Sequence, residues 1–125
     1  MQNKKLTVTC GEQADNHALL KAEVSGVIDS YTSRSFQKSV LEMAENEVSV
    51  ILLDCSGLTY VSSAGIGSFV IVGDKLGSRG GLVLYALPSK VLKVFTMLNM
   101  ASFFNISENE EEALDRAASL LKKSS

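Results

Sequence analysis

Two adjacent hydroxyl side chains, Ser62 and Ser63, lie where a strand-like segment gives way to a helix-like one. A hydroxyl at a helix N-terminus lies beside free backbone N–H groups and the positive end of the helix dipole, both of which favour an added anion. A kinase can therefore place a phosphate on Ser63 without unfolding the chain, which makes this serine a candidate switch residue rather than a catalyst. Serine is also a preferred N-cap residue, so the spacing alone leaves capping and phosphorylation both open.

The residues around these serines do not form a recognisable catalytic set. A serine nucleophile needs a base, and the only histidine, His17, belongs to a turn expected at the opposite end of the second strand. The glycines Gly65, Gly67 and Gly73 match neither a phosphate-binding loop nor a dinucleotide fingerprint, and close packing of helix on sheet is favoured over ligand contact for the first two. The sequence therefore predicts no catalytic residue, no metal site and no cofactor.

Two loops are the candidate functional region, because function in an open α/β sheet collects beyond the carboxyl ends of the strands. These loops cover 26–31 and 56–63. If their strands are neighbours, Asp29 lies near Ser63. Asp29 also has a structural interpretation, as a turn residue or a helix cap. Asp54 is expected to accept backbone N–H groups, and Tyr31 and Tyr60 are expected to anchor the loops.

Strands come from two kinds of pattern. Alternating apolar and polar residues predict a hairpin of two strands over 6–10 and 18–28, joined by a polar turn over 11–17. Short, mostly apolar runs predict further strands over 48–53, 82–87 and 103–106.

Helical spacing of apolar residues predicts about four helices, each with one apolar face. The first covers about 32–46, the second begins at Ser63 and ends near Gly77, and the third opens at Pro88 and Ser89. Ser107 or Asn109 is expected to cap the fourth. The third and fourth helices are expected to turn these side chains inward: Val91, Phe95, Leu98, Leu114, Ala117, Ala118 and Leu121.

The order β-β-α-β-α-β-α-β-α predicts an α/β fold. Its mostly parallel sheet has about five strands, one of them an antiparallel edge strand, in a single domain over 1–125. The net charge of −2 gives no reason to expect nucleic acid or an anionic membrane as partner. Without a signal core or a membrane-length apolar run, and with Cys10 and Cys55 as free thiols, we expect a soluble cytoplasmic monomer.

The motifs at these two loops resemble those of a STAS domain, in particular the small bacterial anti-sigma factor antagonists. Gly26 and Asp29 match the family's Gly-x-x-Asp pattern, and the run over 53–66 is similar to its strand followed by Asp-Ser-Ser/Thr-Gly-Leu. The sequence departs from that pattern at Ser62, where the family has Asp, and at Ala64, where it has Ser or Thr. The resemblance covers nearly the whole chain in element order and implies the same fold.

The resemblance implies a non-enzymatic protein that regulates transcription by partner switching. The dephosphorylated form would bind an anti-sigma factor that is a serine kinase of the histidine-kinase-like ATPase type. Phosphorylation of Ser63 would break that complex, and a metal-dependent PP2C-type phosphatase would reset it. The expected partner-binding surface consists of Asp29, Ser62, Ser63, Ala64, Gly65, Ile66 and Gly67.

Two other classes of function stay open at this point. The departures at Ser62 and Ala64 favour, as an alternative, a phosphorylation-independent STAS scaffold or interaction module in another signalling complex. A small-ligand or nucleotide-binding domain rests on the helix N-terminus alone.

Overall fold

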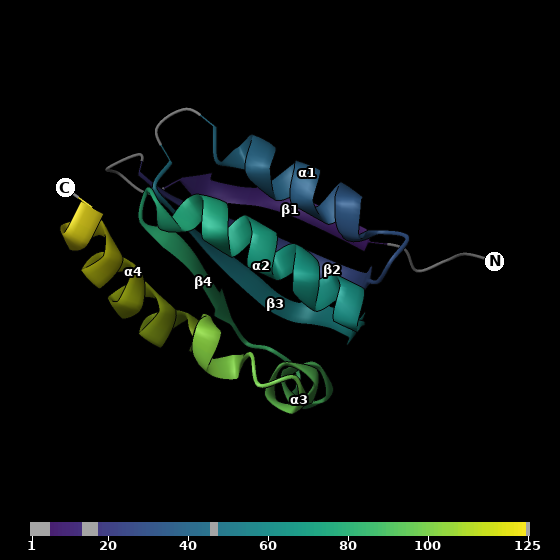
Figure 1. Ribbon diagram of the computed structural model, residues 1–125. Coiled ribbons are helices and arrows are strands. Elements are labelled where there is room, and N and C mark those ends of the chain that lie inside the picture. The colour runs from purple at the N-terminus through teal and green to yellow at the C-terminus, as the bar shows by residue number, and fades with distance from the viewer. Residues whose placement is uncertain (1–5, 14–17, 46–47, 125) are drawn as a thin grey trace.

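A computed structural model describes residues 6–13, 18–45 and 48–124 of the chain. The described strands form one five-stranded sheet in the order β1-β2-β3-β4-β5 (Figure 1). Only the β1–β2 pair is antiparallel, and the other pairs are parallel. The strands are β1 Leu6–Gln13, β2 Leu19–Ile28, β3 Val50–Val61, β4 Gly81–Tyr85 and β5 Asn105–Ser107.

Helices follow the second, third, fourth and fifth strands, which confirms the predicted α/β fold and element order. They are α1 Ser33–Met43, α2 Ser63–Gly77, α3 Ser89–Met97 and α4 Glu110–Ser124, with a short 3₁₀ turn at Ala101–Phe103. None of them, within the described part of the chain, has the length and apolar character needed to cross a membrane.

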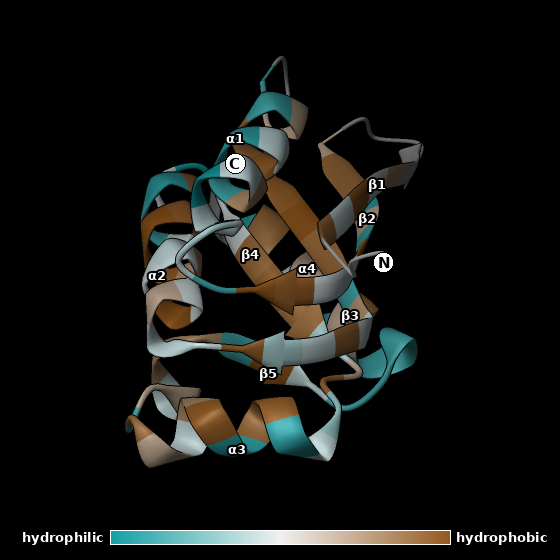
Figure 2. Ribbon diagram, turned by 90° about the vertical axis from the view of Figure 1, so that its right-hand side faces the viewer, coloured by the Kyte–Doolittle hydropathy of each residue, from teal (hydrophilic) through white to brown (hydrophobic). Residues whose placement is uncertain are grey.

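An apolar layer lies on each face of the sheet, because alternate residues of its strands point to opposite faces. The larger layer lies under α1, α2 and α3, where the Phe69 ring contacts Phe36 and Phe95 at centroid distances of 4.8 and 5.4 Å. The smaller layer packs Leu52 and Val83 against Ala113 of α4. In Figure 2 the central strands are coloured mostly apolar, and polar residues mark the outer sides of the helices.

β3 is much longer than predicted, and this is the largest correction to the fold. The expected loop over 56–63 is strand as far as Val61, because β2 runs on to Ile28 and offers a pairing partner along the whole length. The pairing of β3 with β2 shifts register at two places, and these irregularities accommodate the polar residues of β3 within the strand. Leu58 and Val61 are buried, while Thr59 and Tyr60 are exposed.

β1 is also longer than predicted. Residues 11–13 were expected in a turn, but Gln13 still pairs with Leu20 of β2, across a break in the register. The prediction for 14–17, including His17, lies outside the described residues.

The C-terminal third has smaller corrections. Leu98 lies just past the end of α3, and 44% of it is exposed rather than inward. In α4 the buried residues are Ala113 and Ala117, so the inward face is rotated away from Leu114 and Ala118. The last strand starts two residues later than expected, because 101–103 forms a 3₁₀ turn. α1 ends at 43 rather than 46.

Candidate functional site

The candidate site forms where β2 and β3 end side by side and α2 begins. Ile28 pairs with Val61, and the Ser62 N–H donates to the Ile28 carbonyl oxygen at 2.9 Å. Asp29 and Ser63 therefore follow closely on paired residues at the same edge of the sheet. This register confirms that the two strands are neighbours, which was the condition for Asp29 to lie near Ser63.

Ser62 is the N-cap of α2, which separates the roles of the two serines. Its Oγ accepts a hydrogen bond from the Gly65 N–H at 3.1 Å, and its carbonyl oxygen accepts from the Ile66 N–H at 2.9 Å. Its backbone is extended, with φ −88° and ψ 177°, as an N-cap requires. Ser62 is half-buried, and its hydroxyl is engaged in the structure.

Ser63 is the first residue inside α2 and is exposed. Within the described residues, its hydroxyl and the N–H groups of Ser63 and Ala64 take part in no hydrogen bond. The first turn of α2 holds no acidic side chain. An anion at this hydroxyl would be stabilised by the helix dipole by roughly 0.3–1 kcal/mol.

The next three residues differ in exposure. A Cβ at Gly65 would collide with the Ile28 carbonyl oxygen, so glycine is needed for α2 to approach β2 this closely. Ile66 is 3% exposed and packs into the core. Gly67 is exposed, and a Cβ there would meet nothing within 4 Å. Close packing of helix on sheet, which was expected for both Gly65 and Gly67, therefore applies to Gly65 alone. The accessible part of the predicted surface at the start of α2 consists of Ser62, Ser63, Ala64 and Gly67.

Asp29 shapes the neighbouring turn, in agreement with its structural interpretation. Its Oδ1 accepts hydrogen bonds from the N–H groups of Tyr31 and Thr32 at 2.9 and 3.1 Å. Thr32 Oγ1 donates to the Val27 carbonyl oxygen at 2.8 Å. Asp54 acts in the same manner on the Ser56 N–H, at 2.9 Å.

Two tyrosines border this edge, and the prediction that they anchor loops is wrong. Tyr31 is 91% exposed and Tyr60 is 53% exposed. Tyr31 is held by its backbone in the Asp29 turn, which leaves its ring in solvent. Tyr60 precedes the buried Val61 on a strand, where successive side chains point to opposite faces. Strict alternation from the buried Leu58 would turn Tyr60 inward, and the irregular pairing that leaves Thr59 without a paired residue on β2 turns it outward instead.

Two ionisable side chains near the Asp54 carboxylate have raised pKa values. Burial, and then the Asp54 carboxylate, raise the pKa of the Cys55 thiol. The same two causes, in that order, raise the pKa of Tyr85 to about 12. Cys10 is exposed on β1. No group of three or more His, Cys, Asp or Glu side chains in the described residues is arranged to hold a metal ion.

Known proteins share this architecture. The STAS domain family model matches residues 12–113. The anti-sigma-B factor antagonist of Listeria monocytogenes is 28% identical over 90 residues, which cover 71% of this chain and 79% of that protein. An anti-sigma factor antagonist from Mycobacterium paratuberculosis has a TM-score of 0.79 at 18% identity, over 91% of this chain and 95% of that one. The phosphorylated form of SpoIIAA from Bacillus has a TM-score of 0.61 at 18% identity, over 88% and 98%.

Proposed function

This chain belongs to the STAS domain family, and on that premise we propose that it is an anti-sigma factor antagonist switched by phosphorylation of Ser63. The unmodified protein binds an anti-sigma factor that is a serine kinase of the histidine-kinase-like ATPase type. The kinase phosphorylates Ser63 and is then released, and a PP2C-type phosphatase restores the binding form. The chain itself acts in the cytoplasm as a binding partner and not as an enzyme.

The exposed hydroxyl of Ser63 at the start of α2 is the observation that carries this proposal. Because Ser62 caps the helix, a phosphate on Ser63 removes no structural hydrogen bond. The free N–H groups of the first turn and the helix dipole accommodate the new charge. The similarity in fold to a phosphorylated SpoIIAA supports the idea that such a domain stays folded when modified.

The chemistry of the surrounding surface explains why phosphorylation would release a partner. The accessible residues of the first turns, Ser62, Ser63, Ala64 and Gly67, are all uncharged and small. A partner that packs closely on them excludes water from the Ser63 hydroxyl. Phosphate adds a charge of about −1.5 to −2 at that point. Each 1.4 kcal/mol or so of repulsion and lost solvation costs about tenfold in affinity.

Tyr31 and Tyr60 extend this surface, together with Asp29. Exposed aromatic side chains are enriched among the residues that dominate binding energies in protein interfaces. Tyr31 adds a large, nearly fully exposed ring beside the turn that Asp29 holds. We assign it to the kinase-binding surface, with Tyr60 at the margin.

Phosphorylation assays with the serine kinases encoded beside this gene, followed by mass spectrometry, test the proposal. Phosphate is expected on Ser63 of the wild type and on no residue of Ser63→Ala. Ser89→Ala is the matched control, because Ser89 is an exposed serine at the first position of α3, which follows the carboxyl end of β4. Ser89→Ala should be modified like the wild type.

Calorimetry with the same kinase tests the switch itself. The unmodified protein and Ser63→Ala should both bind, and protein phosphorylated at Ser63 should bind at least about tenfold more weakly. Equal binding by both forms would overturn the switch and favour a phosphorylation-independent scaffold. Phosphate found on Ser62 in place of Ser63 would contradict the assignment of the modified residue.

A further inference from the structure

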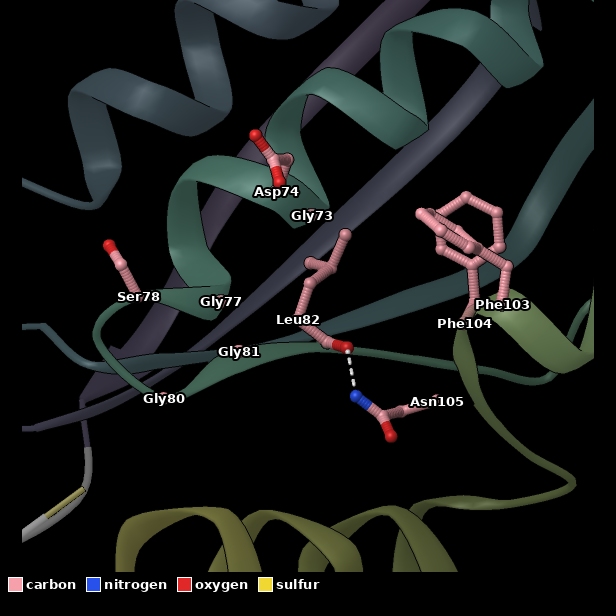
Figure 3. A pocket seen from close by; sticks show the side chains of 10 residues that line it. All are labelled: Gly73, Asp74, Gly77, Ser78, Gly80, Gly81, Leu82, Phe103, Phe104 and Asn105. Carbon is pink, nitrogen blue, oxygen red and sulfur yellow. Dashed lines mark hydrogen bonds between the residues drawn. The ribbon is translucent and has the colours of Figure 1, made fainter. Parts of the chain in front are cut away.

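A groove lies at the far end of α2 from Ser63, and none of the functions considered above uses it. It runs between the last turns of α2 and the segment over 103–105, and its volume is about 400 Å³ (Figure 3). Asp74, Gly77 and Ser78 line the helical side, and Phe103 and Asn105 line the other. The groove is therefore bordered by a carboxylate, small residues and an aromatic ring.

The walls of the groove are set by the fold. The Asn105 side-chain amide donates a hydrogen bond to the Leu82 carbonyl oxygen at 3.2 Å, which holds one wall against β4. On the helical side, a Cβ at Gly73 would be in ordinary contact with the Phe104 ring, at 3.7 Å. A Cβ at Gly77 would meet nothing within 4 Å, so the groove is open at that residue.

The electrostatics of this end of α2 favour a cation. The C-terminus of a helix is the negative end of its dipole. Asp74 is exposed, and within the described residues its carboxylate forms no ion pair or hydrogen bond. Two basic side chains are near in sequence, but Lys75 does not line the groove. The Arg79 guanidinium donates to carbonyl oxygens of 44 and 48, beside the end of α1.

Exposed apolar side chains also lie in the groove wall and just before it in sequence. Phe103 is 59% exposed, and Met97 and Leu98, at the end of α3, are 74% and 44% exposed. Met97 and Leu98 precede the short 3₁₀ turn, and Phe103 is the last residue of that turn. A small cation would leave this apolar surface in water, whereas a peptide segment with apolar residues beside its cation would cover it.

We propose that this groove binds a partner protein through an arginine side chain flanked by apolar residues. Arginine fits better than lysine, because its planar guanidinium stacks on an aromatic face and forms forked hydrogen bonds with a carboxylate. Phe103 supplies the aromatic face, Asp74 the carboxylate and Met97 with Leu98 the apolar contact. The proposal does not depend on the function assigned to Ser63, which lies at the other end of the helix.

Nuclear magnetic resonance with a model peptide tests this site. The probe is acetyl-Leu-Arg-Phe-amide, and its control carries citrulline in place of arginine, which keeps the shape and removes the charge. The backbone amides of the four glycines that line the groove, Gly73, Gly77, Gly80 and Gly81, are the reporters. The arginine peptide should shift these signals and bind at least about tenfold more tightly than the citrulline peptide.

Two variants locate the contact. Asp74→Asn should weaken binding of the arginine peptide about tenfold, whereas Asp115→Asn, at an exposed position of α4, should leave it unchanged. Gly77→Leu should fold normally, because there is space for its side chain, and should block the groove. Its fold is checked by circular dichroism.

Several results would overturn the proposal. These are no shift at the four glycines, equal affinity for the two peptides, or unchanged binding by folded Gly77→Leu. Arginine amide alone binding as tightly as the tripeptide would identify a small-cation site instead of a protein-docking groove. Loss of phosphorylation at Ser63 in the earlier assays would leave these expectations untouched, so the two proposals fail separately.

Discussion

The two ends of α2 differ in packing and in polarity. At its N-terminus the helix is capped by Ser62, lies directly against β2 at Gly65, and offers unbonded N–H groups to an anion. At its C-terminus it stands away from its neighbours at Gly77 and carries the Asp74 carboxylate, which favours a cation. One helix therefore presents two recognition surfaces of opposite electrostatic preference.

The sheet explains the difference in packing. The N-terminal end is tied to β2 by the hydrogen bond from the Ser62 N–H to the Ile28 carbonyl oxygen, so the helix has to approach the strand there. The C-terminal end is tied to the chain through the Gly80 N–H, which donates to the Leu76 carbonyl oxygen, and the segment after α3 forms the other side of the groove. The last turn of α2 still packs Leu76 into the core, so the space for a bound segment lies only on the side of Gly77.

Gly65→Ala is expected to have the largest effect on stability. The added Cβ collides with the Ile28 carbonyl oxygen and crowds Val61 Cγ1 at 2.9 Å, and backbone has little freedom to move. The free energy of unfolding should fall by about 2–3 kcal/mol, measured by urea denaturation. A loss below about 0.5 kcal/mol would show that the N-terminal end of α2 is not tightly packed.

Tyr31→Ala should affect binding and leave the fold intact. Its ring is 91% exposed, so truncation removes almost no internal contact. Affinity for the anti-sigma kinase should fall about tenfold or more, measured by calorimetry, with a change in unfolding free energy within about 0.5 kcal/mol. Met97→Ala, which truncates another exposed apolar residue at the groove end, is the control and should bind the kinase normally. Equal losses from both variants would contradict the separation of the two surfaces.

Local patterns predict much of this fold. Alternation at Leu20, Ala22 and Val24 gives β2 its buried face, and the apolar spacing after Ser63 gives α2 its start. The local pattern does not predict that β3 continues beyond Leu53, because Ser56 and Gly57 are residue types typical of a loop. Their strand conformation comes from pairing with β2, more than 30 residues away in sequence.

The two surfaces differ in how far the sequence predicts them. Topology alone places Asp29 and Ser63 at one edge, because parallel neighbouring strands end together. The sequence does not decide which serine caps α2, since both hydroxyls suit an N-cap. The groove is invisible in sequence, because Gly77 and Phe103 are brought together only by the docking of two separate segments.

Ser62→Ala and Ser63→Ala should separate the structural hydroxyl from the exposed one. Ser62→Ala removes the hydrogen bond to the Gly65 N–H and should cost about 1 kcal/mol of unfolding free energy. Ser63→Ala removes a hydroxyl without a partner in the described residues and should change stability by less than about 0.5 kcal/mol. Urea denaturation of both variants measures the difference. The reverse order of the two losses would mean that Ser63, and not Ser62, caps the helix.

Gly77→Ala should have the smallest effect and the opposite sign to Gly65→Ala. Both are glycine-to-alanine changes in the same helix, and neither glycine has a positive φ angle, so their difference reports packing alone. Alanine at 77 meets no neighbour and restricts the unfolded chain, which should raise the unfolding free energy by about 0.5 kcal/mol. Thermal denaturation should show this as a rise in Tm of about 2 °C. If Gly77→Ala destabilised the protein as much as Gly65→Ala, the C-terminal end of α2 would be packed as closely as the N-terminal end, and the groove would not be open to a partner.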